Sequence, residues 1–151
     1  MSADSLRLVR YQGAIVREHH ILLIRQQERA SGRDYWVIPG GGRLEGETEE
    51  TCVIREMKEE TNLDVQVVRL LLDEAREPGR VYRRAKTYLC TVVGGEAQPG
   101  YEPEPEVAQT YAIVEVGWFD LRDQASWGEK LRCDAITYSL LLSLRSVLGY
   151  V

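Results

Sequence analysis

Residues 41–63 read GGRLEGETEETCVIREMKEETNL, and this stretch places seven glutamates within 23 residues. Three of them, Glu56, Glu59 and Glu60, fall within five positions. Carboxylates that are so close together repel one another unless a cation neutralises them. The stretch therefore has to fold into a structure that holds these side chains near a positive charge.

A helix is predicted over residues 48–61. Thr48 is a good N-cap, and Glu49 and Glu50 suit the positive end of the helix dipole. Asn62 tolerates the left-handed conformation that commonly ends a helix. The glutamates therefore lie on a helix that follows the glycines at 40–42.

The three glutamates share one face of this helix. Taking Glu56 as zero and about 100° per residue, Glu59 lies near about −60° and Glu60 near about +40°. Arg55 and Lys58 are expected to turn the other way. The flank beside the carboxylates is expected to anchor the helix in the core, through Ile54, Met57 and Thr61.

A divalent cation would neutralise such a cluster. Mg²⁺ prefers oxygen ligands, takes a few carboxylates, and shares the rest of its shell with water and substrate phosphate. The glycines Gly40 to Gly42 predict a tight turn whose backbone approaches the same ion or a phosphate. The alternative is a solvated acidic helix face, which the glutamate spacing alone would favour.

The composition limits the classes of function that this protein can have. A chain of 151 residues suits one domain over 1–151, and 44% apolar with 28% charged residues is ordinary for a globular protein. The net charge of −5 argues against a general binder of nucleic acid or anionic membranes. A small anionic ligand remains compatible with this charge, because a metal or a local arginine cluster can reverse the sign inside a pocket.

The cysteines and the hydropathy predict a cytoplasmic protein. Cys52, Cys90 and Cys133 are odd in number and widely spaced, so buried free thiols are expected rather than disulfides or a zinc site. No signal peptide is expected at the N-terminus, and no apolar run is long enough to span a membrane.

The rest of the chain alternates short strands with turns. Strands are predicted at 6–16, 21–24, 35–38, 65–72, 81–93 and 112–119, with a turn at 77–80 that makes a hairpin and a loop over 94–105. A last helix is predicted over 133–148, with one apolar stripe formed by Ile136, Leu140, Leu141, Leu144 and Leu148. Because strands and helices mix along the chain, an α/β/α sandwich with a central mixed sheet is expected.

The glutamate-rich stretch resembles the Nudix box, G-x5-E-x7-R-E-U-x-E-E-x-G-U, where U is a bulky apolar residue. Eight of the nine defined positions match in register: Gly41, Glu47, Arg55, Glu56, Met57, Glu59, Glu60 and Leu63. The departure is Asn62, where the family has glycine, and both residues accept a positive φ. So many matches over 23 residues are far more specific than a lone glycine motif.

The resemblance implies a Nudix-like hydrolase that cleaves the pyrophosphate linkage of a nucleoside diphosphate derivative with Mg²⁺, or with Mn²⁺ as the alternative. The expected substrate is a nucleotide sugar, an ADP-ribose-type molecule or a nucleoside triphosphate. Carried over by position, Glu56, Glu59 and Glu60 are metal ligands, joined by a carbonyl of Gly40 or Gly41. Glu47 and Arg55 are the supporting pair. The general base is a box glutamate or one from the loop sequence GYEPEPEV, where Glu102, Glu104 and Glu106 are candidates and Glu106 is preferred.

The substrate is expected to be a small nucleotide, which needs cations and a flat surface. Arg84, Lys86 and Tyr88 alternate onto one face of a predicted strand, and Arg25 and Arg33 precede the box. For the first three, a solvated sheet face is the alternative. Trp36 is expected in the core rather than under a nucleobase.

Two other functions remain open at this point. One is a non-catalytic module that senses or regulates through a nucleotide on the same fold, although it would not need the complete set of glutamates. The other is an acidic structural domain without metal dependence. The last helix packs either on the sheet or partly on a second subunit, so a homodimer is one arrangement that its leucines allow.

Overall fold

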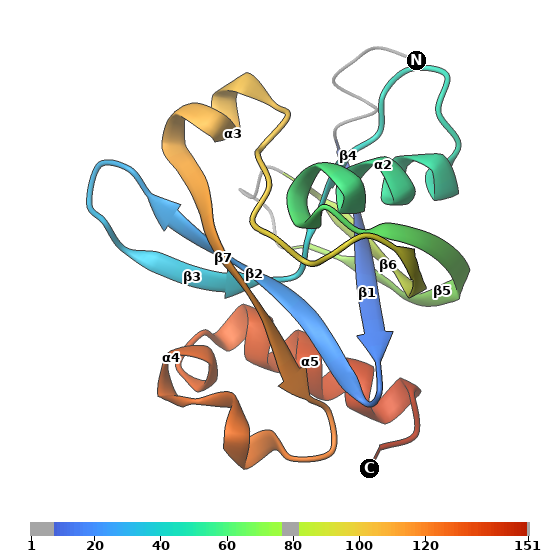
Figure 1. The fold of residues 1–151 in the computed structure, drawn as a ribbon, viewed down its shortest axis with the longest axis vertical. Coiled ribbons are helices and arrows are strands. Elements are labelled where there is room, and N and C mark those ends of the chain that lie inside the picture. Colours follow the sequence, from blue (N-terminus) through green and yellow to red (C-terminus); the bar gives the residue numbers. More distant parts are fainter. Residues whose placement is uncertain (1–7, 77–81, 151) are drawn as a thin grey trace.

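A central mixed β-sheet lies between helices in the computed structural model, which describes residues 8–76 and 82–150 (Figure 1). This confirms the predicted α/β architecture. The turn predicted at 77–80 lies outside the described residues. The elements in chain order are β1 (Val9–Arg17), β2 (His20–Glu28), β3 (Asp34–Val37), β4 (Gly40–Gly42), α2 (Glu49–Thr61), β5 (Asp64–Ala75), β6 (Arg84–Gly94), α3 (Pro105–Thr110), β7 (Tyr111–Asp120), the 3-10 helix η1 (Gln124–Trp127), α4 (Glu129–Arg132) and α5 (Ala135–Val147).

The described strands form one seven-stranded sheet with the order β3-β2-β1-β6-β5, in which β4 also pairs with β1 and β7 with β2. β1 and β6 run parallel, whereas the other neighbours are antiparallel. The antiparallel pairing of β5 with β6 confirms that these two predicted strands lie side by side.

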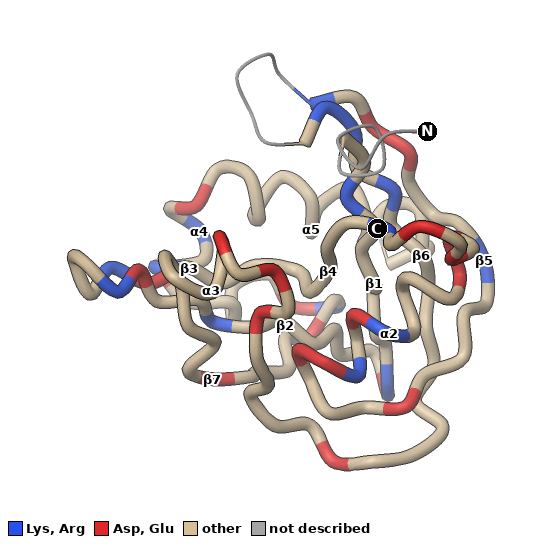
Figure 2. The backbone as a smooth tube through the Cα atoms, turned by 90° about the horizontal axis from the view of Figure 1, so that it is seen from above, with Lys and Arg blue, Asp and Glu red and all other residues tan. Residues whose placement is uncertain are grey.

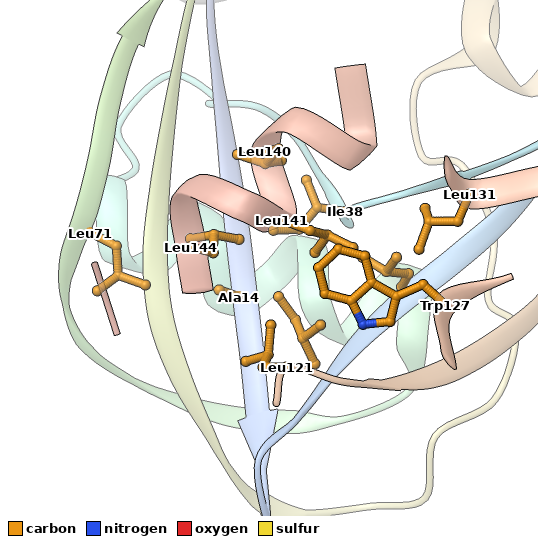
Figure 3. Packing of buried hydrophobic residues seen from close by; sticks show 11 residues of the cluster. Ala14, Ile38, Leu71, Leu121, Trp127, Leu131, Leu140, Leu141 and Leu144 are labelled. Carbon is orange, nitrogen blue, oxygen red and sulfur yellow. The ribbon is translucent and has the colours of Figure 1, made fainter. Parts of the chain in front are cut away.

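The two faces of the sheet are covered by α2 and α5. Side chains alternate between the faces of a strand, so Ile15 packs with the α2 cluster and its neighbour Ala14 with the α5 cluster. Figure 3 shows leucines of α5 in the same buried cluster as Ala14. Leu140, Leu141 and Leu144 are buried there, so this face of α5 packs on the chain's own sheet.

The stripe predicted on the last helix is wrong at one position. Ile136 is 42% exposed, while its neighbour Thr137 is buried. Thr137 donates a hydrogen bond from its hydroxyl to the carbonyl of Trp36 (2.8 Å), which turns that side of α5 toward β3. Ile136 consequently points away from the core.

The predicted ends of the box helix are confirmed. The Thr48 hydroxyl accepts from the Thr51 amide (3.1 Å), and Asn62 ends α2 with a φ of 65°. The predicted anchoring flank is only partly right, because Ile54 is 40% exposed and the residues that enter the core beside Met57 and Thr61 are Cys52 and Val53.

Two segments differ from the prediction of turns and loops. Gly40–Gly42 is the short strand β4 rather than a free turn, because it pairs with β1. A Cβ on Gly40 would lie 2.4 Å from the carbonyl oxygen of Tyr11, so the pairing needs glycine at this position. Pro105 was expected to close a loop, but it begins α3, because its fixed φ suits the first position of a helix.

The short elements η1 and α4 were not predicted.

None of the helices in the described part of the chain is long and apolar enough to cross a membrane.

Candidate functional site

The helix α2 carries its carboxylates against β4. Glu56 and Glu60 are each 1% exposed, and Glu59 is half-buried. The amide of Gly40 donates to Oε1 of Glu60 (2.9 Å). A Cβ on Gly41 would lie 2.5 Å from Oε1 of Glu56, so glycine at this position lets the carboxylate approach the strand. Two of the three predicted glutamates, Glu56 and Glu60, therefore lie beside the glycines.

The guanidinium of Arg55 lies among the carboxylates. It donates to both oxygens of Glu47 (2.6 and 2.9 Å) and, through Nη1, to Glu56 and Glu59 (3.0 Å each). Its Nη2 also donates to the carbonyl of Gly42 (3.1 Å). The expectation that Arg55 turns away is therefore wrong, because its long side chain bends back toward the negative charges.

Hydrogen bonding keeps the pair of Glu47 and Arg55 ionised. Burial opposes ionisation of Glu47, but hydrogen bonds from Arg55 and from the amide of Leu44 outweigh it and lower the pKa of Glu47. The hydrogen bond to Glu47 in turn raises the pKa of Arg55. Arg55 thus holds Glu47 and orients two of the three clustered glutamates.

Glu56 and Glu60 are difficult to ionise in this environment. Burial, with a contribution from Glu59, raises the pKa of Glu56 to about 7 against the opposing charge of Arg55. Burial and then the charges of Glu102 and Glu56 raise the pKa of Glu60 well above its usual range. Oε2 of Glu56 and Oε2 of Glu60 are buried without a hydrogen-bond partner. Such a pair is favourable only with protons or with a further cation.

The donor set fits a hard divalent cation. Among the described residues, no three side chains of His, Cys, Asp or Glu lie close enough together to hold a metal ion. Arg55 donates to both Glu56 and Glu59 and lies between them. The two unpartnered oxygens are nevertheless of the type that Mg²⁺ takes as ligands, and their burial is unfavourable for carboxylates without a cation. Glu56, Glu59 and Glu60 could therefore hold such an ion.

The chain before α3 brings two more carboxylates to this site. Glu102 accepts from the side-chain amide of Gln26, and its charge contributes to the raised pKa of both Glu59 and Glu60, in each case after burial. Figure 2 shows acidic segments of α2 and of the chain leading into α3 on the same side of the molecule.

Of the three loop glutamates, Glu104 also reaches the site, whereas Glu106 is on α3. Oε1 of Glu104 accepts from the Gly42 amide (3.3 Å) and the Tyr82 hydroxyl (3.4 Å). Glu106 is exposed in the first turn of α3.

Three of the residues predicted to bind substrate pair with other side chains of the protein. Nζ of Lys86 (3.1 and 3.2 Å) and the hydroxyl of Tyr88 donate to Glu49 at the start of α2. Arg84 pairs with Asp73. These three side chains therefore hold neighbouring elements together.

The other two predicted cations are also outside the carboxylate site. Arg25 pairs with Asp34 and Glu115, and Arg33 is exposed after β2. Trp36 packs edge-on against Phe119 with ring centroids 5.0 Å apart, beside the core as expected.

A cavity of about 570 Å³ adjoins the carboxylate site. Arg10 connects the two, since it lines the cavity and its charge acts on Glu56 and Glu60. The other lining residues are Gln12, Gln26, Tyr35, Val37, Ile38, Arg76, Tyr82, Glu104, Val107, Tyr111, Asp134, Ile136, Thr137 and Leu140. The sequence offered one signal, because Arg10 and Gln12 are polar at alternate positions of a strand whose other residues are largely buried.

The structure is similar to that of an ADP-ribose pyrophosphatase from Streptococcus suis. The two share a TM-score of 0.66 and 26% identity, and the match covers 93% of this chain and 90% of that one. A UDP-X diphosphatase matches with a TM-score of 0.65 at 24% identity over 94% of this chain and 63% of that one, which concerns the fold alone.

Sequence relatives agree with this likeness. A Caenorhabditis elegans protein named as a nudix hydrolase is 35% identical over 95 residues, which are 63% of this chain and 25% of that protein. The ADP-ribose pyrophosphatase of Methanocaldococcus jannaschii is 35% identical over 95 residues, which are 61% of this chain and 55% of the relative. The chain thus spans between 25% and 55% of the length of these relatives. The NUDIX domain model matches residues 8–133, and the chain therefore belongs to the Nudix family.

Proposed function

We propose that this chain is a metal-dependent pyrophosphohydrolase, in which residues 1–151 act as one domain on a nucleoside diphosphate derivative. The observation that carries the proposal is the pair of buried carboxylates, Glu56 and Glu60, each with an unpartnered oxygen. The charge of Arg10, which lines the cavity, acts on both of them. Two buried acids of this kind suit a bound cation, and the adjoining cavity suits the molecule on which that cation acts.

Glu56, Glu59 and Glu60 would hold Mg²⁺, or Mn²⁺ as the alternative, with a carbonyl of Gly40 or Gly41 as a further ligand. When bound, the ion withdraws charge from phosphate oxygens and lowers the pKa of an attacking water. Arg55 orients the carboxylates through its hydrogen bonds to Glu56 and Glu59.

The cavity is the proposed place of the nucleotide. Arg10 and Arg76 both line the cavity, and the charge of Arg10 also acts on Glu60, so its guanidinium, which donates to the Ile38 carbonyl (2.8 Å), is the cation proposed for a substrate phosphate. Tyr35, Tyr82 and Tyr111 line the cavity and offer flat rings for a base or a sugar. An ADP-ribose-type substrate is favoured by the names of the relatives from Methanocaldococcus jannaschii and Streptococcus suis.

The general base is proposed on the chain before α3. We prefer Glu102 and Glu104, because Glu102 accepts from the side chain of Gln26 and Glu104 from the amide of Gly42, and Glu106 on α3 is the third candidate. A carboxylate at this place would accept a proton from the attacking water, whose oxygen forms a bond to one phosphorus. The bond from that phosphorus to the bridging oxygen breaks, and the other phosphate leaves with this oxygen.

A substrate panel with Mg²⁺ tests the proposal. The purified protein is incubated with ADP-ribose, nucleotide sugars, dinucleoside polyphosphates and nucleoside triphosphates, with and without EDTA, and the products are separated by chromatography. We expect metal-dependent cleavage, strongest with ADP-ribose. Glu59→Gln and Glu60→Gln should each lower turnover at least ~100-fold, because metal stabilisation of the transition state contributes several kcal/mol.

Glu50→Gln is the matched control, since Glu50 is an exposed glutamate in the first turn of the same helix. It should leave turnover unchanged. Near-normal turnover in both Glu59→Gln and Glu60→Gln, with the fold intact, would refute the proposal. Saturable binding of ADP-ribose without any product would instead support the nucleotide-sensing alternative.

A further inference from the structure

The chain between β6 and α3 lies against the C-terminal end of α2. In Figure 1 this stretch passes the end of α2 on its way to α3. Three successive carbonyls at the end of α2 accept hydrogen bonds from amides of this stretch. The carbonyl of Thr61 accepts from Gln98 (2.9 Å), that of Glu60 accepts from Gly100 (2.9 Å), and that of Glu59 accepts from Tyr101 (3.0 Å). We call residues 95–101 the docked segment.

These bonds satisfy carbonyls that a helix end leaves without partners. The last four C=O groups of an α-helix have no acceptor role inside the helix. Here two of the three carbonyls belong to Glu59 and Glu60, whose side chains are proposed metal ligands. The docked segment is therefore fixed to the same two residues that form the carboxylate site.

Close backbone approach makes glycine necessary in this segment. A Cβ on Gly100 would lie 1.8 Å from the carbonyl oxygen of Glu59. A Cβ on Gly95 would lie 2.6 Å from the carbonyl oxygen of Asn62, and Gly95 has a φ of +85°. Both contacts are with backbone, which cannot move aside as the end of a flexible side chain can.

Asn62 adds a side-chain contact to the docking. Its side-chain amide donates to the carbonyl of Glu96 (3.0 Å). Glycine, which the Nudix box has at this position, would adopt the same positive φ but could not make this bond. The one departure of this chain from the box is thus used to hold the docked segment.

We propose that the docked segment positions Glu102 and Glu104 over the carboxylate site, with Gly100 and Asn62 as positioning residues. Glu102 follows the segment directly, and Glu104 reaches the amide of Gly42 (3.3 Å). The consequence for turnover rests on the proposed function, whereas the docking itself does not.

The test compares Gly100→Ala with Gly94→Ala. Gly94 is in the same part of the chain, but a Cβ there would meet its nearest neighbour, Oδ2 of Asp64, at 3.4 Å, an ordinary contact. In Gly100→Ala we expect kcat to fall at least ~10-fold with KM within about threefold, since a misplaced base affects the chemical step more than binding. Gly94→Ala should match the parent protein in both constants.

Two measurements read the docking without any substrate. Hydrogen exchange at the amides of Gln98, Gly100 and Tyr101 should become faster in Gly100→Ala, and the NMR signal of the Gly42 amide should shift as its bond to Glu104 is lost. Asn62→Gly should accelerate the same exchange to a smaller extent and leave the helix intact.

The proposed positioning is overturned if exchange and the Gly42 signal are unchanged in Gly100→Ala. If both change while kcat stays normal, the positioning holds but its proposed role in turnover is refuted. If the parent protein cleaves no diphosphate at all, the proposed function fails. Exchange and the Gly42 signal still decide in that case whether the segment positions Glu104.

Discussion

Replacing Glu56 with glutamine should stabilise the metal-free protein at alkaline pH even as it removes most of the activity. The Glu56 side chain is 1% exposed, and its Oε2 has no hydrogen-bond partner. Burial, with help from Glu59, raises its pKa from 4.5 to about 7. Ionisation of Glu56 therefore lowers the free energy of unfolding. Glutamine does not ionise and avoids this loss.

The sign and the size follow from the pKa. Because the folded state binds the Glu56 proton more tightly than the unfolded state, this group lowers the free energy of unfolding as the pH rises from 4.5 to about 7. A rise in pKa from 4.5 to about 7 corresponds to about 3 kcal/mol. For a domain of this size that is a difference of roughly 6–12 °C in Tm.

Thermal unfolding after EDTA treatment measures this effect. Tm is recorded for the parent protein and Glu56→Gln at about pH 5 and about pH 8, and the difference between the two proteins is compared across pH. Any effect of the substitution that does not depend on charge cancels in this comparison. An equal difference at both pH values would show that burial does not destabilise the carboxylate, and the argument for a cation at this site would fail. Added Mg²⁺ should raise the Tm of the parent and not of the variant.

Three further outcomes are expected. Arg10→Gln should raise KM for the diphosphate substrate at least ~10-fold, because a guanidinium contact to phosphate is a strong charge-assisted bond. The Mg²⁺-induced rise in Tm should remain in this variant. An unchanged KM would show that Arg10 does not bind the substrate. Tyr88→Phe should lower Tm while leaving KM within about twofold, since its hydroxyl bonds Glu49 rather than the cavity; a raised KM would restore its predicted role in binding. Iodoacetamide should label the exposed Cys133 in the native protein but label Cys52 and Cys90 only after unfolding. Burial raises the pKa of the Cys52 and Cys90 thiols to about 12, so few of them are reactive thiolates. Mass spectrometry of the labelled peptides shows which cysteines have reacted.

Some features could be predicted from short stretches of sequence. The ends of α2 depend on Thr48 and Asn62, whose side-chain and backbone preferences act within one turn of the helix. Apart from β4, the strands and the pairing of β5 with β6 follow from local runs of apolar and β-branched residues. The grouping of Glu56, Glu59 and Glu60 follows from the helical period alone.

Other features depended on which segments meet in space. The direction of Arg55 was mispredicted, since the helical period places its Cβ but not a guanidinium at the end of a long chain. Lys86 and Tyr88 looked like ligands for phosphate, and only the packing of β6 beside the start of α2 directs them to Glu49.

The sequence by itself determined the carboxylate helix and the order of helices and strands from which the class of the fold is predicted, because helix and strand preferences act between residues that are near one another in the chain. Tertiary structure alone decided the cavity beside Arg10 and the docking of residues 95–101 on α2, because these bring together segments that are far apart in the chain and that bear no local mark of their partners.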